Sequence, residues 1–189
     1  QKPKANDPDT TLDIYVLSQD LNSNLIAPSE ALKGNLRNYI NQYRMIGDTV
    51  NIKNAFVVNI GVNFEIVTLP NYNNSQVLTE CITSLQRHFE IDKWQINQPI
   101  MLRNLSIILD NIKGVQTVNN ITISNKAGTT LGYSQYAYDV SGALQNGTIF
   151  PSIDPMIFEV KYPNADIIGR VVSIGQGGGS TANGGGRNY

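Results

Sequence analysis

The feature that most constrains the fold is an alternating run of apolar residues at positions 56–67. Every second side chain in this run is large and apolar, and these residues are Phe56, Val58, Ile60, Val62, Phe64 and Ile66. A period of two sustained over 12 residues is typical of a long β-strand with one buried face. Pro70 and the asparagines after it end the run. The chain therefore contains a sheet and needs an apolar layer to cover it.

Three helices are predicted by apolar residues that recur at helical spacing. The first has the stripe Leu32, Leu36, Tyr39, Ile40 and Tyr43. It opens at Pro28 or Ser29, and Gly47–Asp48 ends it. The second begins near Ser75 and has Val77, Leu78, Cys81, Ile82, Leu85 and Phe89 on one side. The third has Met101, Leu102, Leu105, Ile108, Leu109 and Ile112 in register, with Gly114 as its expected C-cap.

Short strands are predicted at 12–17 and 115–124, so the order is strand, helix, long strand, helix, helix, strand. This order indicates an α+β fold, a small sheet with helices packed on one face. We assign residues 1–10 to a linker and residues 11–124 to this α+β sandwich domain.

The character of the sequence changes at residue 125, where helical periodicity stops. Short β-type stretches at 133–140, 148–150, 156–162 and 167–174 alternate with turns such as Asn146–Gly147. We interpret residues 125–174 as an irregular β-rich extension that lies against the domain or against another subunit. Residues 175–189 include seven glycines and are interpreted as a flexible tail.

Charge and composition exclude several functions. The 14 basic and 15 acidic residues form no basic run, so we expect no nucleic-acid binding. No apolar stretch reaches about 18 residues and no signal-peptide pattern is present, so we expect neither a membrane span nor secretion. Only 15% of residues are charged, and a polar but weakly charged surface suits packing against other chains. Because the chain begins at Gln1, we interpret it as part of a longer protein.

Candidate catalytic residues are few. His88 is the only histidine and follows the apolar face of the second helix, where a helix-end role is expected. Cys81 lies on that apolar face and is expected to be a core residue. Carboxylates at Asp154, Glu159 and Asp166 are not placed across a cleft by any sequence pattern. Gly175–Ser180 lacks the third glycine and the following helix of a phosphate-binding loop. We therefore predict no catalytic residue, no metal site and no cofactor.

Aromatic residues gather in the half of the chain that is least able to bury them. They are Tyr133, Tyr136, Tyr138, Phe150, Phe158 and Tyr162. Aromatic side chains give a large contact area for little loss of conformational entropy, so they recur as anchors of protein interfaces. These six residues are interface candidates. The alternative is that they pack the extension onto the first domain, and the sequence leaves both open.

The order and spacing of several segments resemble a known family. The segments are LDIYVL at 12–17, PSEAL at 28–32, IGDTV at 46–50, PIMLRNL at 99–105 and IKGVQTV at 112–118. Over residues 10–125 they resemble the second half of baseplate J-like proteins. Two later segments, YSQYAYDV at 133–140 and PMIFEVKYP at 155–163, resemble the carboxy-terminal part of wedge proteins of T-even-like contractile phages.

The resemblance implies a structural subunit of the virion and no enzyme. Members of this family self-associate and join other baseplate wedge proteins into a ring around the central hub of the tail, after assembly in the host cytoplasm. The expected state is a homo-oligomer within that ring, with contacts through the C-terminal aromatic residues and the exposed side of the first helix. Two alternatives stay open: a carbohydrate- or receptor-binding module of the tail, and a cell-wall hydrolase.

Overall fold

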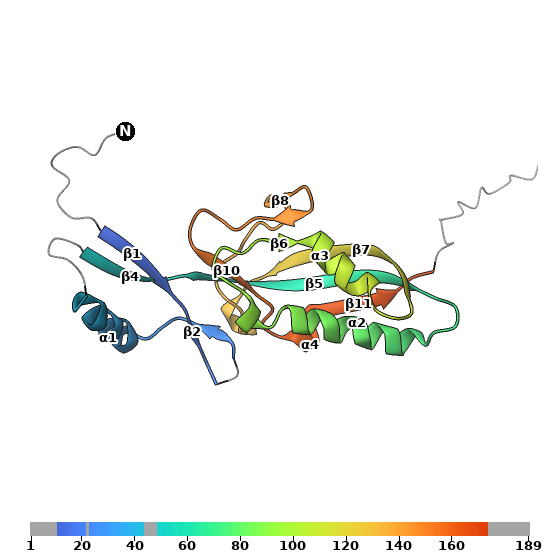
Figure 1. Ribbon diagram of the computed structural model, residues 1–189, viewed down its shortest axis with the longest axis horizontal. Helices are drawn as coiled ribbons and strands as arrows, with labels where there is room; N and C mark the ends of the chain where they lie inside the picture. The colour runs from blue at the N-terminus through green and yellow to red at the C-terminus, as the bar shows by residue number, and fades with distance from the viewer. Residues whose placement is uncertain (1–10, 22, 44–48, 174–189) are drawn as a thin grey trace, which may run out of the picture.

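The computed structural model describes residues 11–21, 23–43 and 49–173. The predicted linker at 1–10, the glycine-rich tail at 175–189 and the predicted helix end at Gly47–Asp48 lie outside these residues. Figure 1 shows an elongated molecule, with one long strand running through its main body and a smaller unit at the N-terminal end.

The long strand β5 (Phe56–Thr68) is the centre of the main sheet, as the alternating run predicts. On one edge it pairs antiparallel with β7 (Val115–Lys126). On the other edge it pairs in parallel first with β10 (Met156–Glu159) and then with β11 (Ile167–Val171). The short helix α4 (Pro163–Asp166) joins β10 to β11. Both edges of β5 are thus paired over most of its length.

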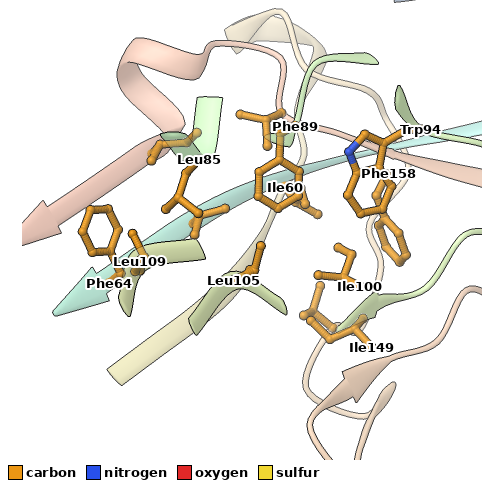
Figure 2. Packing of buried hydrophobic residues seen from close by; sticks show 14 of the residues in the cluster. Ile60, Phe64, Leu85, Phe89, Trp94, Ile100, Leu105, Leu109, Ile149 and Phe158 are labelled. Carbon is orange, nitrogen blue, oxygen red and sulfur yellow. The ribbon is translucent and has the colours of Figure 1, made fainter. Parts of the chain in front are cut away.

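Two helices, α2 (Asn74–His88) and α3 (Leu102–Asp110), contact each other and cover one face of this sheet. The even-numbered residues of β5 from Val58 to Ile66 are all buried, which is the predicted buried face. Figure 2 shows two of them, Ile60 and Phe64, in one cluster with Leu85 of α2 and Leu105 and Leu109 of α3. Each fully buried side chain of this kind stabilises the fold by about 1.5–3 kcal/mol. A mixed α+β fold with helices on one face of a small sheet is confirmed.

The ends of the helices follow their capping residues. The Asn73 side chain accepts hydrogen bonds from the backbone N–H groups of Ser75 and Gln76 and starts α2. The prediction that Gly114 caps the third helix is wrong, because α3 ends at Asp110 with Asn111 as its cap. Gly114 lies further on, with φ +96°, in the turn into β7. A Cβ atom there would lie 2.6 Å from Cδ1 of Tyr72, so the position requires glycine for both reasons.

The N-terminal unit consists of β1 (Thr11–Val16), α1 (Glu30–Asn41) and β4 (Thr49–Asn54). β1 and β4 form a parallel two-stranded sheet of their own, and α1 packs on β4. The hydroxyl of Ser29 accepts a hydrogen bond from the N–H of Leu32, which confirms one of the two predicted starts of this helix. A small hairpin of β2 (Ser18–Gln19) and β3 (Leu25–Ile26) lies between β1 and α1 in the sequence, and the N–H of Leu25 in β3 bonds to Glu159 of the main sheet.

The predicted extension from residue 125 shares its sheet with the preceding residues, because β10 and β11 are strands of the main sheet. β8 (Leu144–Gln145) and β9 (Thr148–Ile149) form a hairpin whose turn residues Asn146 and Gly147 both have positive φ, as that turn signal predicts. β9 also pairs with β6 (Ile100–Met101). Two short 3₁₀ helices, η1 (Ile91–Lys93) and η2 (Thr129–Leu131), complete the described elements.

The strand predicted at 133–140 does not form. Its backbone groups bond to side chains of the main sheet in place of a neighbouring strand. The N–H of Ser134 donates to Oδ1 of Asn59, and the N–H of Tyr138 donates to Oδ1 of Asn125. The segment therefore lies across the sheet as an irregular chain, and its β-type composition reflects aromatic packing.

We expect Gly169→Ala to lower the free energy of unfolding by about 1–3 kcal/mol. Gly169 pairs with Phe64 across the β11–β5 ladder, and a Cβ atom on it would overlap the buried Phe64 ring. Chemical denaturation followed by circular dichroism measures the change. Gly34→Ala in α1 is the matched control, because nothing lies within 4 Å of the added carbon and alanine favours the helix. A Gly169 variant as stable as this control would contradict the packing argument.

Candidate functional site

Glu159 is a buried carboxylate at the junction of four segments. It ends β10, pairs with Asn59 of β5, and is only 4% exposed. Its Oε1 accepts a hydrogen bond of 2.6 Å from the N–H of Leu25, and its Oε2 accepts one of 2.6 Å from Nδ2 of Asn59. Asn59 in turn accepts from the N–H of Ser134 at 2.6 Å. One carboxylate thus connects β3 and β5 directly to β10. Asn59 extends the network to residues 133–140, which we call the crossing segment.

Burial raises the pKa of Glu159 above its usual value of 4.5, and the hydrogen bonds from Leu25 and Asn59 oppose that shift. Both carboxylate oxygens accept hydrogen bonds from groups of the fold. A catalytic acid or base would need an oxygen directed at substrate. In this arrangement Glu159 stabilises the contacts of β10 with β3 and β5.

Asp166 is a second buried carboxylate and lies at the end of α4. Its Oδ1 accepts a hydrogen bond of 2.6 Å from the Tyr133 hydroxyl, and its Oδ2 accepts one of 2.9 Å from the N–H of Tyr162. The hydrogen bond to this carboxylate raises the pKa of Tyr133 to about 12. Tyr133 therefore stays protonated and anchors the crossing segment to α4.

The six aromatic candidates divide into two groups. Phe158 is 2% exposed and belongs to the core, so it offers no contact surface in this structure. Tyr133 is bonded to Asp166, while Tyr138 packs edge-on against Phe158 and donates its hydroxyl hydrogen bond to the carbonyl of Phe150. These residues attach the crossing segment to the sheet.

The other three, Tyr136, Phe150 and Tyr162, are exposed enough to contact a partner. Tyr136 packs edge-on against Phe56, which holds the tyrosine ring in place. Tyr136 also lines a cavity of about 310 Å³ together with Tyr133, Asn54 and Lys161. The packing alternative therefore describes Tyr133, Tyr138 and Phe158, while an interface role for the three exposed rings stays a prediction.

A second group of exposed apolar side chains lies along α1 and includes Tyr43, just past its end. No residue of α1 is buried, and Leu32, Tyr39 and Tyr43 are 49%, 59% and 72% exposed. The rings of Tyr39 and Tyr43 contact each other at 5.1 Å between centroids. We call these three residues the α1 stripe. The five-residue apolar pattern predicts this helix, but it does not indicate that three of its five side chains stay exposed.

The two isolated candidate catalytic residues, Cys81 and His88, pack against apolar or aromatic side chains. Cys81 is completely buried, which confirms its expected place in the core, and burial raises its pKa to about 11. His88 is the last residue of α2 and contacts the rings of Phe89 and Trp94 edge-on, and burial lowers its pKa. Within the described part of the chain, no three His, Cys, Asp or Glu residues are grouped to hold a metal. None of the helices in that part is long and apolar enough to cross a membrane.

The pH dependence of stability should reveal the buried carboxylate. The folded protein binds a proton at Glu159 more tightly than the unfolded chain does, because the pKa is raised on folding. Stability from this group is therefore present below about pH 4.5 and is lost as the pH rises toward the folded pKa. Glu159→Gln removes the titration, so we expect the difference in unfolding free energy, variant minus wild type, to become more positive through that window.

The comparison uses urea denaturation of both proteins between pH 4 and pH 8. The substituted amide also changes the hydrogen bond to Asn59, but that offset does not depend on pH. Asp154→Asn is the matched control, since Asp154 lies in the exposed loop before β10. Parallel curves for wild type and Glu159→Gln would show that the pKa of Glu159 is not raised.

Comparisons with known proteins do not supply a function. No protein-family model matches the sequence, and no curated protein matches it. The function is therefore inferred from the geometry of the chain and from the sequence resemblance described above.

Proposed function

We propose that the protein is a structural subunit of a phage tail baseplate wedge, within the virion, and that it works through protein–protein contacts. It joins neighbouring subunits and other wedge proteins into a ring around the central hub. The observation that supports this most directly is the α1 stripe, an apolar and aromatic surface that the residues described by the structure leave uncovered. The sequence resemblance to baseplate J-like proteins supplies the identity of the assembly.

The energetics of the α1 stripe favour a protein partner. An exposed tyrosine side chain presents a large part of its roughly 150–250 Å², and contiguous apolar patches of several hundred Å² on a monomer are usually functional. Tyrosine anchors also lose little conformational entropy on binding. The described residues of the N-terminal unit place α1 on β4 and leave the outer side of the helix uncovered. A neighbouring subunit supplies the missing cover.

The hydrolase alternative has less support. It needs two carboxylates across a groove, one of them able to donate a proton to substrate. Glu159 is buried with both oxygens hydrogen-bonded, and Asp166 is buried with both oxygens hydrogen-bonded. Catalysis by either one would require these hydrogen bonds to break.

A carbohydrate-binding role is the second candidate. The cavity of about 310 Å³ beside Asn59 has tyrosine rings, amide side chains and the Lys161 ammonium in its lining. Flat rings and amides suit a sugar. Glycan binding that is lost in Tyr136→Ala, with no affinity for wedge proteins, would favour this function.

The structural function is tested by the triple variant Leu32→Ser/Tyr39→Ser/Tyr43→Ser. We expect it to keep the wild-type thermal unfolding temperature within a few degrees, because these side chains are exposed. We expect its affinity for purified wedge proteins of the same phage, measured by biolayer interferometry, to fall at least tenfold. Ile153→Ser is the matched control, since Ile153 is a fully exposed apolar residue in a different region.

Localisation provides the complementary measurement. Antibodies against the protein should label the baseplate end of intact tails in electron micrographs. Wild-type protein that binds no wedge protein and is absent from tails would refute the proposal.

A further inference from the structure

The outer edge of β1 is an unprotected strand edge. Within the residues that the structure describes, β4 is the only strand hydrogen-bonded to β1, so one row of its backbone groups has no strand beside it. Natural sheets protect such edges with lysine, proline, bulges or very short strands. β1 has six residues, TLDIYV, with no lysine, proline or bulge, and its one charged side chain, Asp13, is ion-paired with Lys53 of β4 at 2.7 Å. Its composition is rich in β-branched and aromatic residues, which favour strand pairing.

Other sheet edges of the protein are protected. β4 contains Lys53, followed by Asn54, and the first residues of β7 have register shifts against β5 that interrupt a regular edge. β10 has four residues and β11 has five, so that outer edge is divided into short pieces. β1 is therefore the edge best suited to accept another strand.

The apolar face of β1 is also incompletely covered. Leu12 and Val50 are paired residues on the same face of the β1–β4 sheet, yet Leu12 is 58% exposed and Val50 only 8%. The helix α1 packs on β4, which explains the difference. Both the edge of β1 and the side chain beside it are thus available to a neighbour.

We propose that β1 pairs antiparallel with β1 of a second copy of this chain, which gives a continuous four-stranded sheet in the order β4–β1–β1–β4. This inference rests on the proposed function and names one contact within it. A two-fold axis perpendicular to the sheet relates the strands, so the pair is centred on one residue. Residues on the same face then lie opposite each other.

Charge selects the register. Centring on Asp13 would place the two Asp13 carboxylates opposite each other, and like charges in that position are destabilising. Centring on Ile14 places Asp13 opposite Tyr15 of the second copy, and Leu12 opposite Val16. All apolar side chains then continue the face that contains Val50 and Ile52. The Ile14-centred register is the one that pairs the most residues without opposing charges.

The interface is small. A strand of six residues is about 20 Å long, which places the contact at the low end of specific interfaces, below about 1,200 Å². We expect a dissociation constant in the micromolar range, so that monomer and dimer exchange with concentration. Contacts elsewhere in a ring would add to this affinity.

Cysteine cross-linking tests the register in the full chain. In Ile14→Cys the two sulfur atoms belong to directly opposed residues, whose Cα atoms lie about 4.5–5.5 Å apart and within disulfide range. We expect mild oxidation to give a covalent dimer. Val16→Cys is the matched control, because its two copies would be about 13 Å apart along the strands. Cys81 is completely buried and does not compete.

Charge reversal tests the energetics by analytical ultracentrifugation from 1 µM to 1 mM. Tyr15→Glu places a second carboxylate opposite Asp13 twice in each dimer, and we expect the dissociation constant to rise about tenfold. Tyr15→Gln removes the ring without adding a charge and keeps the Asp13–Lys53 ion pair, so it is the matched control, and we expect its constant to stay within about threefold of wild type. Circular dichroism melting of each variant confirms that the monomer is folded.

Three results would overturn the strand pairing: a wild-type monomer at every concentration, equal cross-linking of the two cysteine variants, or no response to Tyr15→Glu. Each leaves the proposed function intact if wedge proteins still bind through the α1 stripe. Conversely, a β1-paired dimer that binds no wedge protein and is absent from tails would refute the proposed function alone.

Discussion

The structure depends on one requirement, that the backbone of β5 be hydrogen-bonded on both edges while it is buried. An unpaired buried peptide group costs about 1–3 kcal/mol, so a 13-residue strand in the centre of a fold needs continuous neighbours. β7 fills one edge. β10 and β11 share the other edge of β5, and the short helix α4 lies between these two strands in the sequence. The positions of α2, α3 and the crossing segment follow, because each packs on a face of the sheet that these pairings create.

The two faces of that sheet are held in different ways. Apolar packing of α2 and α3 covers one face, while the Glu159–Asn59 and Asp166–Tyr133 hydrogen bonds hold segments near the other. Hydrogen bonds depend on geometry, so they fix where an irregular chain lies when it has no strand register. This division lets residues 132–140 hold a definite path without helix or strand structure. It also leaves Tyr136 at the surface while Tyr133 and Tyr138 are tied down.

Local periodicity was sufficient for β5 and α2, because each has one apolar face that repeats at its own spacing, and the capping residue Ser29 was sufficient for the start of α1. It was insufficient wherever the answer depends on distant residues. Asn59 lies on the polar side of the alternating run, yet it is buried because a segment 75 residues later crosses over it. The α1 pattern predicts a helix but not whether this chain covers it. The candidate aromatic residues were found by composition, and only the fold separates core Phe158 from exposed Tyr136.

The pairing of β5 with strands at the end of the chain has a consequence for synthesis. Asn59 and Glu159 meet in the sheet although 100 residues separate them in sequence. During translation β5 and β7 can pair early, but one edge of β5 stays open until β10 and β11 have left the ribosome. Long-range parallel pairing of this kind folds slowly and exposes an apolar strand in the meantime. The nascent chain should therefore depend on chaperones until β10 and β11 are made, and termination before these strands should yield an aggregating product.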